Sequence, residues 1–428
     1  MTQQPAALNM PPRPEEAVRH QSLRWIGAGL CTAFAIYIAF LRPPEGLNRA
    51  ALGASAVLIW AVSFWILDVM PEYIVGMLMC TFWSVFKIVP FDKAFANFSS
   101  SNWWIMVGAF GLGAAATKSG LLRRIALRIL KACPPTFMGQ SLGLLGAGTV
   151  LSPLVPSASA RSALASPIAL AISDSLGYRR KTSAASGLFG AMYLGFCVVG
   201  SPLFLTGTFI NYATMAQFPK AYQGVSWLSW LLYGLPWGIL TFVGCAVALY
   251  LLYRPSGPIA SPATTASDEL ARLGPMTREE KATALVLVLT LAMWMTEGVH
   301  KISAGEVAVV SLCVLLALDV LTRDDFRKRI DWSSIIYIGA LLNLGTVFQT
   351  LKIDLWLGHA LQSTIASFVS NPYIFVVAFA IVVLLARFVI VSITSAAVIF
   401  TIVFSPLVPA YGMHPWMIAF IALAASNV

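Results

Sequence analysis

Charged residues are scarce in this chain: Asp, Glu, Lys and Arg make up only 11% of its 428 residues, whereas 58% are hydrophobic. A soluble protein of this length needs far more charge to cover its surface. Several apolar runs approach the roughly 20 residues that cross about 30 Å of hydrocarbon. The composition therefore excludes a soluble globular protein and predicts an all-α polytopic membrane protein.

The chain also lacks the patterns of a metal centre or a hydrolase. Its six cysteines are dispersed and form no CxxC pair, and its four histidines are scattered. Such spacing indicates neither a disulfide framework nor a zinc site. No HExxH sequence occurs, and no Ser/His/Asp arrangement suggests a hydrolase. We expect neither an enzyme nor a resident cofactor.

Acidic residues are fewer than basic ones, 18 against 28, which gives a net charge of +10. The basic residues cluster between apolar stretches and not on a soluble domain, which argues against nucleic-acid binding. Short basic loops belong on the cytoplasmic side of a membrane. Together with Arg19 and Arg24 they place the N-terminus in the cytoplasm and the protein in a bacterial inner membrane. The clusters lie at 123–131, 179–181 and 323–329.

The apolar runs divide the chain into a cytoplasmic tail (1–23), a first half (24–253), a cytoplasmic linker (254–280) and a second half (281–428). The linker is rich in Pro, Ser, Thr and charge. Full spans are expected at 24–41, 50–68, 74–90, 103–120, 228–252, 281–297, 304–321 and 333–350.

Two further segments have special patterns. From Leu121 to Cys133, apolar residues repeat at helical spacing opposite the arginines, which predicts an amphipathic helix in the cytoplasmic interface. The span at 183–211 is interrupted in its outer half, because Gly195, Gly200-Ser201-Pro202 and Gly207 break the helix.

Two polar clusters lie inside apolar stretches: Pro156–Ser162 within 137–177, and Ser392–Ala397 within 372–412. Polar groups at membrane depth need a cavity, a ligand or another helix. Because residues 137–177 begin and end beside basic clusters, either two full spans or one re-entrant hairpin satisfies the topology. The arms on either side of the polar cluster are short, which favours the hairpin, and the same interpretation applies to 372–412.

The second half repeats the plan of the first. The two polar clusters lie about 235 residues apart, and Gly108 and Gly113 are echoed by Gly339 and Gly345 at a similar offset. Counting spans makes the halves inverted, as in alternating-access transporters. By this symmetry the chain ends before the counterpart of 200–211 and a final span, so we expect it to be truncated at its C-terminus.

These motifs resemble the divalent anion/sodium symporter family, most nearly its 2-oxoglutarate/malate translocator branch. Pro156-Ser157-Ala158-Ser159-Ala160-Arg161, followed by Pro167-Ile168, is similar to that branch's Pro-Ser-Asn-Thr-Ala-Arg and Pro-Ile. The run 201–207 resembles its broken helix, and 108–127 its fourth span and interfacial helix. The resemblance covers nearly the whole chain from residue 24. It implies two inverted repeats with re-entrant hairpins and broken helices, a homodimer, and transport of dicarboxylates, tricarboxylates such as citrate, or sulfate.

One departure from the family pattern concerns the ion. In the family, an asparagine at each hairpin tip contacts the carboxylate and helps to arrange the sodium site. Ala158 and Ile393 occupy these positions here, and neither side chain donates a hydrogen bond or binds a cation. Hydroxyl and carbonyl oxygens remain, so a sodium site is a candidate near Ser157, Gly200 and Ser392. Anion exchange, or a substrate different from the usual dicarboxylate, gains weight over sodium symport of a dicarboxylate.

The expected substrate site combines both tips with the broken helix. A half-helix that begins at the midplane offers free N–H groups and the positive end of its dipole to an anion. Its residues are Ser157, Ala158, Ser159, Arg161, Ser201, Thr206, Arg387, Ser392, Ile393 and Thr394. The alternative for the small polar residues is that they only permit close helix packing.

Two arginines lie at membrane depth. A planar guanidinium suits bidentate carboxylate binding, which makes Arg161 and Arg387 candidate substrate contacts. Alternatively they pair with buried carbonyls, or Arg387 extends to the interface. The resulting hypothesis is a secondary transporter of di- or tricarboxylate anions, by sodium symport or anion exchange. The alternatives are a related inorganic-ion transporter and a truncated membrane protein that does not transport.

Overall fold

The computed structural model describes residues 14–253, 255, 265–357, 360, 371–388, 390 and 392–426, and within these ranges the chain forms helices and turns without a β-strand. The helices of the first half are α1 (Pro14–Phe40), α2 (Arg49–Leu67), α3 (Glu72–Val85), α4 (Phe91–Ala94), α5 (Ser101–Lys118), α6 (Leu121–Ala132), α7 (Phe137–Leu151), α8 (Ala158–Ser175), α9 (Ser183–Tyr193), the π-helical η3 (Leu194–Val199), α10 (Gly200–Leu203), α11 (Phe209–Met215) and α12 (Trp227–Tyr253). Those that follow are α13 (Thr265–Leu273), α14 (Arg278–Met295), α15 (Glu297–His300), α16 (Ala304–Ala317), α17 (Arg323–Lys328), α18 (Trp332–Thr350), α20 (Pro372–Ala386), α21 (Ile393–Phe404) and α22 (Trp416–Ser426).

Several of these helices are long and apolar enough to cross a membrane. In the described part of the chain they are Arg49–Leu67, Ser183–Leu203, Trp227–Tyr253 and Trp332–Thr350. The pair α5 and α6 adds a fifth if it is counted as one span, although its axis bends by 66°. Shorter apolar helices, among them α3, α16, α20 and α21, accompany them. The expected all-α polytopic membrane protein is thus confirmed.

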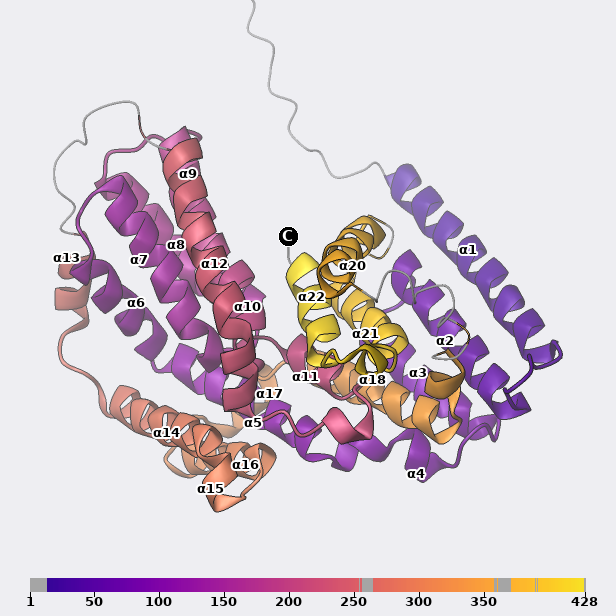
Figure 1. The fold of residues 1–428 in the computed structure, drawn as a ribbon. Coiled ribbons are helices and arrows are strands. Elements are labelled where there is room, and N and C mark those ends of the chain that lie inside the picture. The colour runs from indigo at the N-terminus through magenta and orange to yellow at the C-terminus, as the bar shows by residue number, and fades with distance from the viewer. Residues whose placement is uncertain are drawn as a thin grey trace, which may run out of the picture.

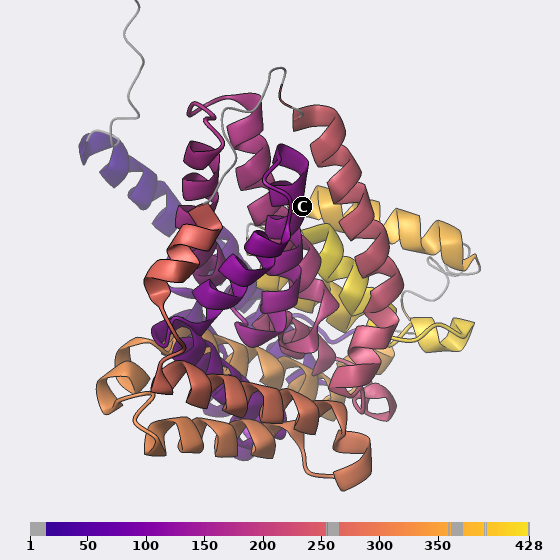
Figure 2. The ribbon, with the colours of Figure 1, turned by 90° about the vertical axis from the view of Figure 1, so that its left-hand side faces the viewer.

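The helices form two groups with a third between them (Figure 1). The helices α7, α8, α9 and α12 pack together on one side, and α1, α2, α3 and α18 on the other. Between the groups lie α11, α21 and α22, which contact one another. The pair α14 and α16 lies below the group of α7, α8, α9 and α12 in Figure 1 and packs on α5, and the rotated view in Figure 2 shows the same lower layer. The short α11 therefore connects the broken helix of the first half to the second half.

Ion pairs fix α5 and α6 to the segments that begin the second half. Arg124 of α6 pairs with Glu280 at 2.7 Å, both side chains being 4% exposed, and it also donates to the carbonyl of Gly274 at 2.8 Å. At the end of α5, Lys118 pairs with Asp325 at 2.7 Å. Because these contacts cross between the halves, the bend at α5–α6 is held from both sides.

Several elements differ from their expected extent. The helix α3 ends at Val85, short of the predicted span to residue 90, and the short α4 follows. The predicted linker contains α13, which packs on α6. The broken helix continues past residue 211 to Met215. Most of residues 351–371, between the predicted span at 333–350 and the stretch at 372–412, lie outside the described residues. The amphipathic prediction for Leu121 to Cys133 agrees with α6, which spans Leu121–Ala132.

Candidate functional site

Arg161 is the most completely buried arginine of the predicted site, with 2% of its surface exposed. Its guanidinium points at main-chain carbonyls: Nε donates to Phe196 at 2.8 Å, and Nη1 donates to Gly207 at 2.6 Å. Nη1 also donates to the carbonyls of Ser152 and Val155, the residues just before α8. Nη2 donates to Ser201 Oγ at 2.6 Å. One side chain thus joins the first polar cluster, the π-helix η3 and the broken helix.

This arrangement is the alternative in which the arginine pairs with buried carbonyls. No carboxylate lies within ion-pair distance of Arg161 among the described residues. A buried cation whose partners are dipoles keeps its charge uncompensated, and its field favours an anion nearby. Direct contact of Arg161 with a substrate stays a prediction, because the N–H groups of its guanidinium donate hydrogen bonds to the protein itself.

The broken helix lies in close contact with the turn before α8 at Gly200. A Cβ built on Gly200 would lie 1.9 Å from Ser152 Oγ and 2.5 Å from Ser152 Cβ. The Ser152 hydroxyl in turn donates to Gly148 at 2.8 Å. Only glycine fits here without displacing the turn before α8, which explains why position 200 of the broken helix is a glycine.

The N-terminus of α8 is the accessible part of the first cluster. Ser157 caps the helix: its Oγ accepts from Ala160 N at 3.3 Å, and its carbonyl accepts from Arg161 N at 3.1 Å. The first N–H groups of a helix have no intrahelical partner, which leaves those of Ala158 and Ser159 as free donors within the helix. Ser159 is exposed, whereas Ser157 and Ala158 are half-buried. These groups can receive an anion.

The broken helix supplies structural polar contacts. Thr206 is fully buried and its Oγ1 accepts from Trp227 Nε1 at 3.1 Å. Asn211 bridges the break, because its Nδ2 donates to the carbonyls of Ser201 at 2.9 Å and Phe204 at 2.7 Å. The bond from Phe209 N to Pro156 O, 3.3 Å long, closes the contact with the first cluster.

The second polar cluster begins α21 in a matching way. Ser392 caps the helix, and its Oγ accepts from Ser395 N at 3.3 Å. Ser395 Oγ lies 2.8 Å from the hydroxyl of Tyr337 in α18. Thr394 is buried and Ile393 is half-buried. Arg387, also half-buried, donates to the carbonyl of Ile390 in the turn between α20 and α21.

The predicted residues therefore gather into two groups. Arg161 and Ser201 form one group with Thr206 close by along the chain, and Ser392 and Thr394 belong to the other. The contact of α11 with α21 links the groups through the broken helix. Their joint action on one ligand stays a prediction.

Sequence reasoning missed two groups beside these clusters. Asn211 is fully buried and its Oδ1 has no hydrogen-bond partner among the described residues. The carboxylate of Glu72, in the first turn of α3, lies close to the side chain of Ser392. Glu72 follows a proline at a helix start, where an acid is ordinary, and only the packing of α3 near α21 reveals it. The Asn at 211 lies past the helix break, where a backbone-bridging amide is useful but leaves no sequence signature.

A cation site has to be built from oxygen atoms of serines and the main chain. No group of three or more His, Cys, Asp or Glu side chains is close enough to hold a metal ion in the described segments. The Ser157 hydroxyl accepts one helix N–H and keeps acceptor capacity for a hard cation. The Ser392 hydroxyl accepts from both the N–H and the hydroxyl of Ser395, so it would have to release one of these bonds to bind sodium.

Comparison with known proteins places this geometry in context. The family model described as the sodium:sulfate symporter transmembrane region matches residues 22–428. The candidate malate transporter YflS of Bacillus subtilis is 25% identical over 366 residues, which cover 83% of this chain and 76% of that protein. The chloroplast dicarboxylate transporter 1 of Spinacia oleracea is 26% identical, over 78% of this chain and 60% of its own length. The citrate/succinate antiporter of Escherichia coli K12 is 28% identical, over 66% and 59%.

Two solved structures share the fold at low sequence identity. The YdaH transporter of Alcanivorax borkumensis matches with a TM-score of 0.54 and 14% identity, over 77% of this chain and 75% of that one. MtrF of Neisseria gonorrhoeae matches with a TM-score of 0.53 and 13% identity, over 98% and 85%. At this identity the likeness establishes the helical membrane fold alone.

Proposed function

Since the chain belongs to the family of the sodium:sulfate symporter transmembrane region, we propose that it is a secondary transporter that carries di- or tricarboxylates by alternating access. The names of the relatives, which include a dicarboxylate transporter and a citrate/succinate antiporter, support this substrate class. The observation that carries the proposal is the buried Arg161, which has no acidic partner among the described residues and lies one helical turn after Ser157.

The proposed recognition uses the N-terminus of α8. A substrate carboxylate accepts hydrogen bonds from the N–H groups of Ala158 and Ser159 and from the hydroxyl of Ser159. The helix dipole and the nearby Arg161 charge both favour an anion there. Arg161 acts as a positioning residue, because its bonds to Gly207 and Ser201 hold the broken helix against the turn that presents these donors.

A second carboxylate is assigned to the second cluster. Thr394 lies in the first turn of α21. The N-terminus of this helix can bind an anion for the same reason as that of α8. In this proposal the two clusters form re-entrant tips from opposite sides of the membrane, in inverted halves with a cytoplasmic N-terminus. Two copies of the chain form a homodimer. In the loaded carrier, a dianion would contact one tip with each of its two charges. In the empty carrier the two tips would lack this link.

For the coupling mode, anion exchange is favoured over sodium symport. The positions of the family asparagines hold Ala158 and Ile393, which remove two side-chain oxygens from the candidate sodium site. If sodium binds, oxygen atoms near Ser157, Gly200 and Ser392 hold it, and it adds positive charge beside the substrate.

One observation favours a proton as a second candidate for the coupling ion. The Glu72 carboxylate lies close to the side chain of Ser392, so an acid is present beside the second cluster. A carboxylate in this place can take up a proton with the substrate and release it on the other side. Glu72→Gln then abolishes stimulation by a pH gradient and leaves exchange intact, with Glu45→Gln, on an exposed loop, as the matched control.

Transport by reconstituted protein tests the proposal. Liposomes containing the purified protein receive radiolabelled succinate, malate, citrate or sulfate, with and without internal unlabelled anion, a sodium gradient or a pH gradient. Exchange predicts uptake that depends on internal dicarboxylate and not on sodium. Uptake driven by sodium alone would contradict the exchange mode. Uptake of sulfate but of no carboxylate would contradict the substrate class, and absence of all uptake would contradict transport of these anions.

A further inference from the structure

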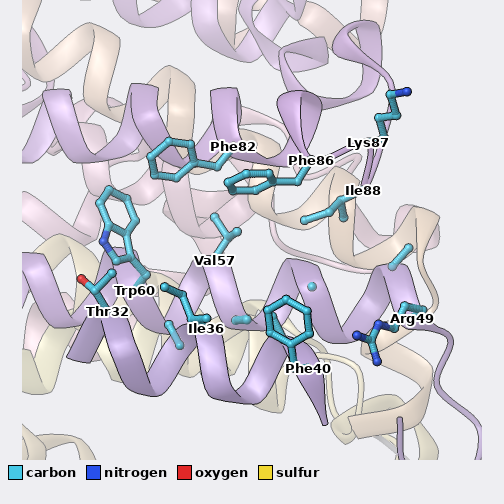
Figure 3. A pocket seen from close by; sticks show the side chains of 15 residues that line it. Thr32, Ile36, Phe40, Arg49, Val57, Trp60, Phe82, Phe86, Lys87 and Ile88 are labelled. Carbon is cyan, nitrogen blue, oxygen red and sulfur yellow. The ribbon is translucent and has the colours of Figure 1, made fainter. Parts of the chain in front are cut away.

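A large cavity lies between α1, α2 and α3, and no residue of either polar cluster lines it (Figure 3). Its volume is about 890 Å³, which is within the roughly 300–1,000 Å³ range of pockets that hold small ligands. Its walls are almost entirely apolar and include Ile36, Phe40, Val57, Trp60, Phe82 and Phe86. The cavity is therefore suited to a hydrocarbon chain and not to a hydrophilic substrate.

Two cations stand at one end of this cavity. Figure 3 shows Arg49 and Lys87 at the same end, with the aromatic side chains of Trp60 and Phe82 toward the other. Arg49 is held in place, because its Nη1 donates to the carbonyl of Leu41 at 2.9 Å and its guanidinium lies 5.9 Å from the ring centroid of Phe40. No acidic residue lines the cavity among the described residues. The charged side chains that line the cavity are therefore both positive.

The rim of the cavity is apolar and open. Phe40 is 75% exposed and Phe86 is 63% exposed. In a membrane protein such rings face hydrocarbon, so the cavity opens toward lipid. The two cations then mark the level of the headgroups, since basic side chains at the ends of spans extend to the interface.

We propose that this cavity binds one anionic phospholipid, with an acyl chain between α1 and α2 and its phosphate between Arg49 and Lys87. The apolar walls match the chain, and the paired cations match the phosphate. A second copy of this protein is a poorer occupant, because a symmetric contact through this face would bring more cations to a cavity that no acid lines among the described residues. The bound lipid fixes α1 against α2.

Native mass spectrometry of the detergent-purified protein tests the assignment. The protein is titrated with phosphatidylglycerol or with phosphatidylcholine of the same acyl chains. We expect one phosphatidylglycerol to be retained preferentially. In Arg49→Gln/Lys87→Gln the retention falls roughly tenfold, because each basic side chain contributes to anionic-lipid binding. Ala39→Trp, which fills the cavity, reduces the retention of both lipids.

The matched control is Arg42→Gln/Lys93→Gln, which removes two exposed cations that do not line the cavity. Equal loss of phosphatidylglycerol in the control and in the cavity variant would overturn the proposal. So would unchanged retention in Lys87→Gln and Ala39→Trp, or a protein dimer that dissociates in Ala39→Trp while lipid binding is unaffected. The readout needs no transport, so failure of the proposed function leaves this test intact.

Discussion

Arg161 Nη2 and Ser201 Oγ lie 2.6 Å apart, although 40 residues separate them in the chain. With the bond from Arg161 Nη1 to Gly207 O, this contact fixes the turn before α8 against the broken helix. A buried arginine that binds carbonyls usually has a structural role. Here its hydrogen bonds go to the turn before α8 and to the broken helix, the two segments that the proposed anion site requires. The pair therefore couples the shape of the site to the stability of the protein.

Arg161→Met should destabilise the protein strongly. The substitution leaves several buried carbonyls without donors, at a cost on the order of 3–5 kcal/mol. We expect the Tm of the detergent-solubilised protein to fall by roughly 5–10 °C, measured by a thermal-shift assay. Arg161→Lys keeps the charge but loses the planar set of N–H donors, so its Tm should lie between those of wild type and Arg161→Met. An unchanged Tm with lost uptake would show that Arg161 binds substrate directly.

Gly200→Ala tests the close contact between Gly200 and Ser152. The new methyl group overlaps Ser152 Oγ, so the variant should lose about 1–3 kcal/mol of stability and most of its transport. Ser152→Gly removes both atoms that the methyl group meets, and the double variant should recover part of the loss. The Tm and initial uptake rate are measured for all four proteins. No recovery in the double variant would show that Gly200 serves a purpose other than this contact.

The Arg124–Glu280 pair should contribute more than the Arg123–Glu269 pair beside it. Burial raises the pKa of Glu280, but hydrogen bonds from Arg124 and the Thr277 backbone outweigh this and hold it below its ordinary value. Removing one partner of a buried pair costs about 3–5 kcal/mol, whereas an exposed pair contributes roughly 0.2–1 kcal/mol. Double-mutant cycles on Tm measure both, with Arg124→Met/Glu280→Gln against Arg123→Met/Glu269→Gln. Equal coupling would remove the burial argument.

The contribution of Asp325 to stability should be independent of pH between pH 5 and about 8. The Lys118 ammonium, followed by Thr322, holds the pKa of Asp325 well below its ordinary value. A depressed carboxylate pKa contributes stability above the unfolded pKa of about 3.9, and this contribution is lost as pH falls through the folded pKa. The difference in Tm between wild type and Asp325→Asn should therefore be constant above pH 5 and shrink below about pH 4. Asp324→Asn is the exposed control. A difference that changes near pH 7 would contradict the assignment.

The sequence predicted the framework well because helices in membranes follow hydropathy and termination signals. The amphipathic run from Leu121 to Cys133 agrees with α6, and Ser157 and Ser392 cap helices at the predicted polar clusters. Serine before a helix is a local signal, and apolar periodicity needs no tertiary information. Both are read directly from neighbouring residues.

The partners of the polar residues were not predictable in the same way. Arg161 binds main-chain carbonyls of Phe196 and Gly207, and carbonyls are present at every residue, so composition cannot select them. The π-helical stretch at Leu194–Val199 depends on the packing of α7 against Gly195, where a Cβ would lie 2.4 Å from Leu145 O. Glu72 lies near Ser392 because α3 packs on α18 and Tyr337 of α18 contacts Ser395 of α21, which is tertiary information.

The measurement that tests the central claim most directly is protection of Ser159→Cys from a maleimide by dicarboxylates. Ser159 is exposed at the start of α8, and Ser183→Cys, exposed at the start of α9, is the control. Peptide mass spectrometry quantifies labelling at each site separately from the native cysteines. The account predicts that succinate or malate at about ten times its Kd slows labelling at 159 roughly tenfold and leaves 183 unchanged. Equal labelling at 159 with and without every dicarboxylate and citrate would contradict an anion site at this helix N-terminus.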